Sequence, residues 1–247
     1  MLPAASTLPC MTTPSDPHPG SGAGPLADPA HREAVIDLLG AMAYGELTAF
    51  SRLAADAELA PTLSDKAQLA RQAAGELHHY DLLDRWLSGI GADVRTAMQP
   101  FVEALDSFHD RTRPSTWLEG LVKAYVGDGI ATDFYREVSA YLDPQTRALV
   151  TEVLQDMGGA EFAVHAVRDA IARDPAVAGR LALWGRRLVG EALSQAQRVA
   201  AQRDALAALL IGGSSTTGGP DLAEIGRVFA RLTDEHTRRM GRLGLSA

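Results

Sequence analysis

The sequence predicts an all-α fold, a four-helix bundle with one long crossover connection and two additional helices at its C-terminal end. Three observations support this fold class. Ala and Leu dominate, and aromatic residues make up only 6% of the 247 residues. Long stretches contain neither Pro nor runs of β-branched residues. Apolar residues recur at the spacings of three and four that mark one face of a helix.

Two segments are expected to lie outside the packed helices. Residues 1–27 are rich in Pro, Gly, Ser and Thr and are predicted to be disordered. The ordered domain is therefore expected to span residues 28–247, a length that can bury one sizeable core. Within this domain, the Gly, Ser and Thr run at residues 212–220 is predicted to be a flexible linker.

The first two helices are predicted to pair across a short turn. An apolar stripe from Val35 to Leu53 indicates a first helix at about residues 29–57. The second helix is expected at about residues 64–88, with Ser64 as its N-cap. The short connection between the two helices predicts an antiparallel hairpin.

A long connection separates this hairpin from the next. Residues 91–114 are predicted to form a crossover that includes a short helix at 101–108. One long crossover between two hairpins is typical of ferritin-like bundles, whereas short loops throughout would indicate an up-and-down bundle. The later helices are predicted from their apolar stripes and from the Pro and Gly residues that bound them, at about residues 115–139, 144–174, 176–210 and 221–242.

The candidate chemistry begins with Glu76 and His79, which stand three residues apart inside the second apolar helix. Residues at this spacing share one helix face, so both side chains can reach a single ion between packed helices. Glu46 lies in the middle of the apolar stripe of the first helix. A lone buried carboxylate costs several kcal/mol, so a cation or a proton must compensate it. These three residues are predicted to bind a metal.

The second hairpin offers a less complete set of ligands. Carboxylate bundles with two metal ions take a Glu from each of two helices and a Glu-x-x-His from each of the other two. Asp128 is predicted to lie on the buried face of the third helix, and Asp156 is expected opposite it in the fourth. Gly159 stands where that motif needs His. The second metal position is therefore predicted to be altered or absent.

Other residues could complete the second half of the site. Glu161 and His165, four residues apart, are the nearest alternative to Asp156. Glu191 and His236, on the two C-terminal helices, could instead fill an open coordination position. Tyr80, beside His79, is a candidate for tuning an oxidant, although such a tyrosine is more often an ordinary core residue.

Several motifs together suggest a family. The segments 44–46 (Tyr-Gly-Glu), 76–80 (Glu-Leu-His-His-Tyr) and 124–129 (Ala-Tyr-Val-Gly-Asp-Gly), with the ending 232–243, resemble the ferritin-like tRNA isopentenyl-adenosine hydroxylases over roughly residues 30–245. The resemblance implies a non-haem di-iron monooxygenase that inserts oxygen from O₂ into a C–H bond. It also implies a modified tRNA as substrate and a reductase as electron donor. From ligand chemistry alone, carboxylates and imidazole suit iron or manganese.

The charge is divided unevenly along the chain. Residues 1–167 contain 11 Lys and Arg against 23 Asp and Glu, whereas residues 168–247 contain 12 Arg against 8 acids. The arginines of this C-terminal third could bind the phosphates of tRNA, but amphipathic helices also carry charged faces exposed to water. The candidates are eleven of these 12 arginines, all except Arg168: Arg173, Arg180, Arg186, Arg187, Arg198, Arg203, Arg227, Arg231, Arg238, Arg239 and Arg242.

Composition also limits the location and the class of the protein. No apolar stretch is long enough for a transmembrane helix, no secretory signal is evident, and Cys10 is the only cysteine. A cytoplasmic protein without membrane contact is therefore expected, and a homodimer is one option for its assembly. Three functional classes fit: an oxygen-activating hydroxylase or oxidase, an iron-handling protein, and a bundle with a degenerate metal site that serves a structural or interaction role.

Overall fold

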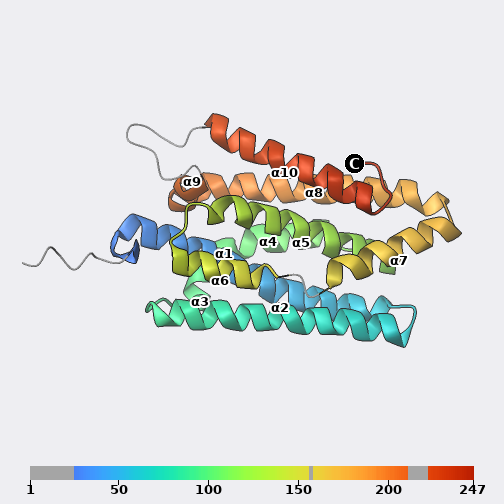
Figure 1. Cartoon of the computed structure of the whole chain (residues 1–247), viewed down its shortest axis with the longest axis horizontal. Helices are drawn as coiled ribbons and strands as arrows, with labels where there is room; N and C mark the ends of the chain where they lie inside the picture. The colour runs from blue at the N-terminus through green and yellow to red at the C-terminus, as the bar shows by residue number, and fades with distance from the viewer. Residues whose placement is uncertain (1–24, 156–157, 211–221) are drawn as a thin grey trace, which may run out of the picture.

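The computed structural model describes residues 25–155, 158–210 and 222–247, and all regular elements in these ranges are helices (Figure 1). The predicted all-α fold class is confirmed. Most of the predicted disordered segment and the predicted linker lie outside the described residues. In chain order the elements are η1 (Pro25–Ala27), α1 (Pro29–Asp56), η2 (Ala57–Leu59), α2 (Leu63–Gly89), α3 (Val94–Met98), η3 (Gln99–Phe101), α4 (Val102–Arg111), α5 (Trp117–Ser139), α6 (Pro144–Val153), α7 (Gly159–Arg173), α8 (Ala176–Gln202), α9 (Asp204–Leu210) and α10 (Leu222–Arg242).

Helices α1 and α2 form the predicted antiparallel pair, and they pack against each other more extensively than any other two described elements (Figure 1). The side chain of Asp28 caps α1 by accepting hydrogen bonds from the amides of Ala30 and His31. The prediction that Ser64 caps α2 is wrong. Thr62 caps α2, because its hydroxyl accepts from the Asp65 amide at 3.1 Å.

The crossover contains two short helices, α3 and α4, where the sequence predicted one. The side chain of Asp93 caps α3 by accepting from the amide of Thr96 at 2.9 Å. Helix α3 lies very close to α1 at Gly40, where an ideal Cβ would be 2.2 Å from the carbonyl oxygen of Ala97. Only glycine permits this approach, which holds the crossover against the first hairpin.

The fourth helix of the bundle is interrupted, contrary to the predicted continuous helix at 144–174. Helix α6 ends at Val153 and α7 begins at Gly159, preceded by Gly158 with a left-handed φ of 89°. An ideal Cβ on Gly159 would lie 2.7 Å from the side-chain nitrogen of Gln72, so the first turn of α7 lies directly against α2. The apolar period continues on both sides of the break, which hides the break from sequence analysis.

The predicted helix at 176–210 is interrupted as well. Helix α8 ends at Gln202, and α9 begins at Asp204. The residue between them, Arg203, points its guanidinium at the buried carboxylate of Asp37 on α1, with hydrogen bonds of 2.9 and 2.5 Å. This two-pronged pair fixes the end of α8 to α1 and explains why the helix stops there.

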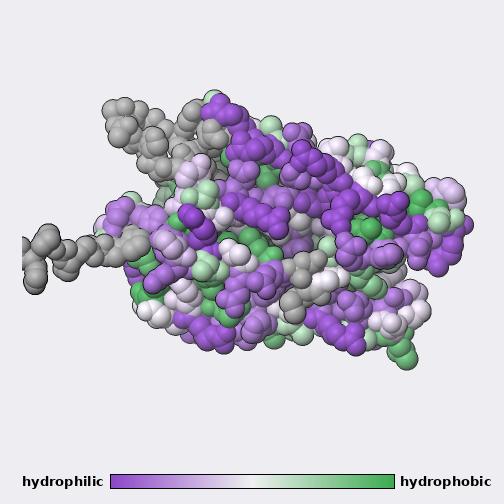
Figure 2. All heavy atoms as spheres, in the orientation of Figure 1, coloured by the Kyte–Doolittle hydropathy of each residue, from purple (hydrophilic) through white to green (hydrophobic). Residues whose placement is uncertain are grey.

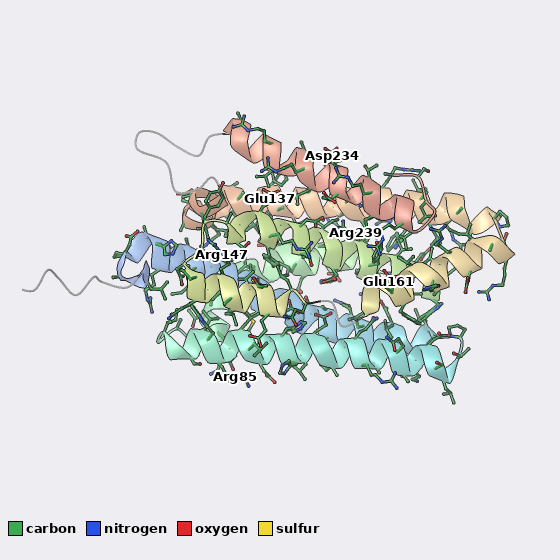
Figure 3. The ribbon with its side chains drawn as sticks, viewed as in Figure 1. Arg85, Glu137, Arg147, Glu161, Asp234 and Arg239 are labelled. Carbon is green, nitrogen blue, oxygen red and sulfur yellow. The ribbon has the colours of Figure 1, made fainter. Side chains whose placement is uncertain are left out.

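Helix α10 lies along α5 and α8 (Figure 1). Arg231 bonds Glu137 of α5 at 2.9 and 2.8 Å, and Arg239 bonds Asp133 of α5 at 2.5 Å. Figure 3 shows Glu137 and Arg239 along the seam between α5 and α10. The C-terminal arginines therefore attach this additional helix to the bundle.

Two clusters of buried apolar side chains fill the molecule. One lies between α1, the second half of α2, α3, the end of α5, α6 and α9. The other lies between the end of α1, the first half of α2, α5, α7, α8 and the end of α10. Figure 2 shows hydrophilic residues over the outward faces of α2 and α10. None of the described helices is apolar over a stretch long enough to cross a bilayer.

Candidate metal centre

Three predicted ligands meet between α1 and α2. The Nδ1 atom of His79 lies 3.5 Å from a carboxylate oxygen of Glu46 and 3.8 Å from one of Glu76. Each residue offers a ligand atom within 4.8 Å of the others, and this is the one group of this kind in the described part of the chain. The predicted convergence of Glu46, Glu76 and His79 is therefore present in the structure.

The local fold places this group inside the hairpin. On α2, the three-residue spacing puts Glu76 and His79 on one face, between the buried residues Ala73 and Leu83. On α1, Glu46 follows the buried residue Ala43 by one turn. The side chains of His79 and Glu46 keep only 11% and 13% of their surface exposed. Two carboxylates and an imidazole are thus held away from bulk water by apolar neighbours.

The electrostatics of the group follow from burial and mutual contact. Burial raises the pKa of Glu46 well above its ordinary value. Contacts with Glu46 and Glu76 raise the pKa of His79 to about 10. Burial acts to raise the pKa of Glu76 too, but its contacts with His79 and Glu46 outweigh burial and lower that pKa. The group therefore holds a proton on His79, and Glu46 is more easily protonated than an ordinary glutamate.

A cation would replace these protons. Carboxylate oxygens and imidazole nitrogen are ligands that iron and manganese accept, and three groups in mutual reach can share one ion. Burial raises the pKa of the Glu46 carboxyl even with the imidazole of His79 beside it, and a buried carboxyl of this kind is a further mark of a cation site. The residues present therefore fit a bound metal ion.

Two tyrosines differ in their relation to this group. Tyr80, the predicted catalytic tyrosine, has a pKa that is raised by burial and by the charge of Asp84 on its own helix, and none of the three ligands contributes to this shift. Tyr135 of α5 was not predicted. Its hydroxyl lies 3.9 Å from the ideal Cβ position on Gly45, and burial together with the charge of Glu46 raises its pKa. Tyr135 was missed because only the fold brings α5 beside Gly45.

The ligands predicted in the second hairpin do not join the group. Asp128 is exposed, so its predicted buried placement is wrong. Helices α8 and α10 cover α5 from outside, and its buried face follows Val122, Val126 and Ile130 instead. Asp156 lies outside the described residues.

The alternative ligands are engaged or placed elsewhere. Glu161 is exposed and pairs with Arg242 of α10 at 2.6 Å, and His165 is exposed on α7 (Figure 3). Glu191 pairs with Arg111 at 3.5 Å. His236 is 2% exposed, and neither of its ring nitrogens has a hydrogen-bond partner within the described residues. None of these four belongs to the ligand group around His79.

Comparisons with known proteins agree with this architecture. A family model described as a ferritin-like domain of actinomycetes matches residues 29–213. Among solved structures, a Synechococcus protein described as "Protein 19 with aldehyde deformylating oxidase activity" is similar with a TM-score of 0.65 and 21% identity. The similarity covers 90% of this chain and 94% of that one. No curated protein matches the sequence at a significant level.

Proposed function

Because the chain belongs to the ferritin-like domain family of actinomycetes, we propose that it is an iron-dependent, oxygen-activating oxidase or hydroxylase. One observation carries this proposal: Glu46, Glu76 and His79 meet in the interior of the α1–α2 hairpin with their ligand atoms within 4.8 Å of one another. Bound iron would supply the activation of O₂ at this position.

The residues of the chain have separate roles in this proposal. Glu46 and Glu76 would hold the ion through hard oxygen atoms, and His79 would hold it through a ring nitrogen. The apolar residues around them exclude water, which strengthens the electrostatic contacts inside the site. The hydroxyl of Tyr135, beside Gly45, is placed to donate a proton or a hydrogen bond on the α5 side of the group.

The structural relative supports the oxidase class only through its fold. That Synechococcus protein is described by an oxidase activity on aldehydes, and at 21% identity the likeness concerns architecture. The narrower proposal, a hydroxylase acting on modified tRNA with a reductase as electron donor, rests on the motif resemblance at 44–46, 76–80 and 124–129. It stays a prediction beside the broader oxidase class.

One observation favours an alternative function. The second hairpin supplies no ligand to the group within the described residues, since Asp128 is exposed and Glu161 is paired with Arg242. A bundle with such a reduced site could bind one metal ion without activating oxygen. It would then serve iron handling or a structural or interaction role.

Anaerobic titration with Fe²⁺, followed by exposure to O₂, separates these functions. We expect the wild-type protein to bind iron and then to consume O₂ in the presence of a chemical reductant. Glu76→Gln and His79→Gln should each weaken iron binding by at least about 100-fold. Glu161→Gln and His165→Gln are matched controls on α7 and should bind as the wild type does.

Two results would change the conclusion. Iron binding without O₂ consumption would support the alternative function. Equal iron binding by the wild type and by His79→Gln would remove the site altogether, because the imidazole would then contribute nothing to binding.

A further inference from the structure

A second buried cluster of ionisable side chains lies at the C-terminal end of α1. Asp56 follows Glu46 by ten residues, which is about 15 Å along the helix axis. Around Asp56 the structure gathers Lys123 of α5 and His109 of α4, with Arg52 on α1. This cluster is separate from the candidate metal centre and has no role in the proposed function.

Lys123 is the unusual member of the cluster. The residue is only 6% exposed, yet no hydrogen bond or ion pair within 4 Å engages its amine among the described residues. Its amine lies over the ring of Phe108, 5.5 Å from the ring centroid. Because the side chain is buried and no carboxylate of the described residues lies within 4 Å of the amine, the charged form is costly, so the site favours the neutral amine or a bound partner.

The composition of the chain strengthens this point. Of the 23 basic residues only Lys66 and Lys123 are lysines, and all others are arginines. Lys66 is on the surface, where it pairs with Glu58 at 2.9 Å. The interior position therefore carries one of the two lysines in the chain, and a lysine, unlike an arginine, can lose its proton. Arginine stays charged at every accessible pH, so a permanent charge is not what this position requires.

The neighbours of Lys123 give the cluster acid and base groups. The carboxylate of Asp56 is seated against Gly120, one turn before Lys123, at 3.3 Å from the ideal Cβ position, and burial raises its pKa. Burial, together with Lys123 and Arg52, lowers the pKa of His109 to about 3, so this imidazole is neutral. Its Nε2 lies 3.3 Å from the hydroxyl of Thr48.

Burial is also the main influence on the amine itself. It lowers the pKa of Lys123 to about 8, against the opposing charge of Asp56. Three further charges, Arg52, Arg113 and Asp110, act on the same amine. A sizeable fraction of the amine is therefore neutral near neutral pH, and the neutral form is the nucleophile.

We propose that Lys123 is a reactive amine that forms an imine with a small aldehyde or ketone entering between α1, α4 and α5. The neutral amine adds to the carbonyl carbon, which forms the C–N bond. In the resulting carbinolamine one proton has passed from the nitrogen to the oxygen. The second nitrogen proton then passes to the oxygen as the C–O bond breaks, which releases water and leaves the neutral imine. Asp56, whose charge acts on the Lys123 amine, would carry these protons by way of water, and the reaction needs no oxidant or reductant.

Reductive trapping on the wild-type protein tests this proposal directly. The full chain is incubated with acetaldehyde and cyanoborohydride, and ethylation of Lys123 and Lys66 is compared by peptide mass mapping. At pH 7.5 an amine of pKa about 8 has a neutral fraction roughly 100-fold larger than that of an ordinary lysine. We expect Lys123 to be labelled at least about tenfold faster than Lys66. Lys66 serves as an internal control within the same molecule.

The outcomes separate a reactive amine from a merely buried one. Labelling of Lys123 that is slower than or equal to that of Lys66 in the folded protein, and that appears only in urea, would overturn the proposal. Asp56→Asn should slow the labelling of Lys123 and leave Lys66 unchanged. Equal labelling of Lys123 in this variant would remove the proton-transfer role of Asp56. The wild-type comparison decides the main proposal even if a variant fails to fold.

Discussion

Metal uptake at the α1–α2 hairpin should release protons, and the number released can be worked out from the structure. Contacts with Glu46 and Glu76 raise the pKa of His79 to about 10, so at pH 7 its imidazole is almost fully protonated. A histidine with an ordinary pKa of about 6.5 would be only about one-quarter protonated at this pH. A metal ligand must be unprotonated, so His79 alone should release about one proton per ion.

Glu46 adds to this number. Burial raises its pKa well above the ordinary value, so part of its population also loses a proton when the metal binds. The total should lie between about one and two protons per ion at pH 7. Removing the proton from His79 costs about 4 kcal/mol of binding free energy at pH 7, because the pKa of His79 lies about three units above this pH. Metal affinity should therefore rise at least about tenfold per pH unit above pH 7 until the pKa of His79 is passed.

Titration calorimetry in two buffers with different ionisation enthalpies measures the released protons, with Zn²⁺ as a redox-inert ion. His165→Gln, on the exposed surface of α7, is the matched control and should release as many protons as the wild type. A release of fewer than about 0.3 protons per ion by the wild type would contradict the predicted protonation of His79. So would binding of the ion by His79→Gln with an unchanged proton count.

Three further predictions concern stability. Gly40→Ala should lower the free energy of unfolding by about 1–3 kcal/mol in urea, because its Cβ would meet the Ala97 carbonyl, whereas the open position Gly190 should tolerate Ala. Burial and Arg239 lower the pKa of His236 to about 4. The stability that the neutral imidazole contributes above pH 6.5 should therefore be lost as the pH falls, by about 2 kcal/mol at pH 5. His236→Gln should reduce this loss. Arg239→Ala should speed hydrogen exchange in α10 without changing that in α2, and equal exchange would contradict the seam described here.

The first half of the site could be predicted because its information is local. Glu76 and His79 share one helix face by spacing alone, and a short turn forces α2 back along α1 beside Glu46. No later part of the chain changes these relations. The helix-period pattern and the short turn were therefore sufficient to find three side chains whose ligand atoms the structure brings within 4.8 Å of one another.

The second half could not be predicted because its geometry depends on distant contacts. The buried face of α5 is set by α8 and α10, which a four-helix template does not contain, and this places Asp128 outside. Gly158, the residue before α7, has a left-handed backbone that does not alter the apolar period, so the break before α7 could not be predicted. The cluster around Lys123 also escaped sequence analysis, because Asp56, His109 and Lys123 come from three separate helices.

The charge division along the chain has an explanation within the fold. Arginines of the last third pair with acids of the first two-thirds, as Arg198 does with Glu103, Arg203 with Asp37 and Arg239 with Asp133. Ion pairs of this kind attach α8, α9 and α10 to the bundle. They also occupy guanidinium groups that would otherwise be able to bind phosphates. The prediction of tRNA binding can be decided by salt dependence, since each phosphate contact steepens the loss of affinity with salt. Retention of tRNA that vanishes between 50 and about 200 mM salt would support a phosphate-binding surface on the remaining arginines. No retention at the lower concentration would leave the arginines with their structural role.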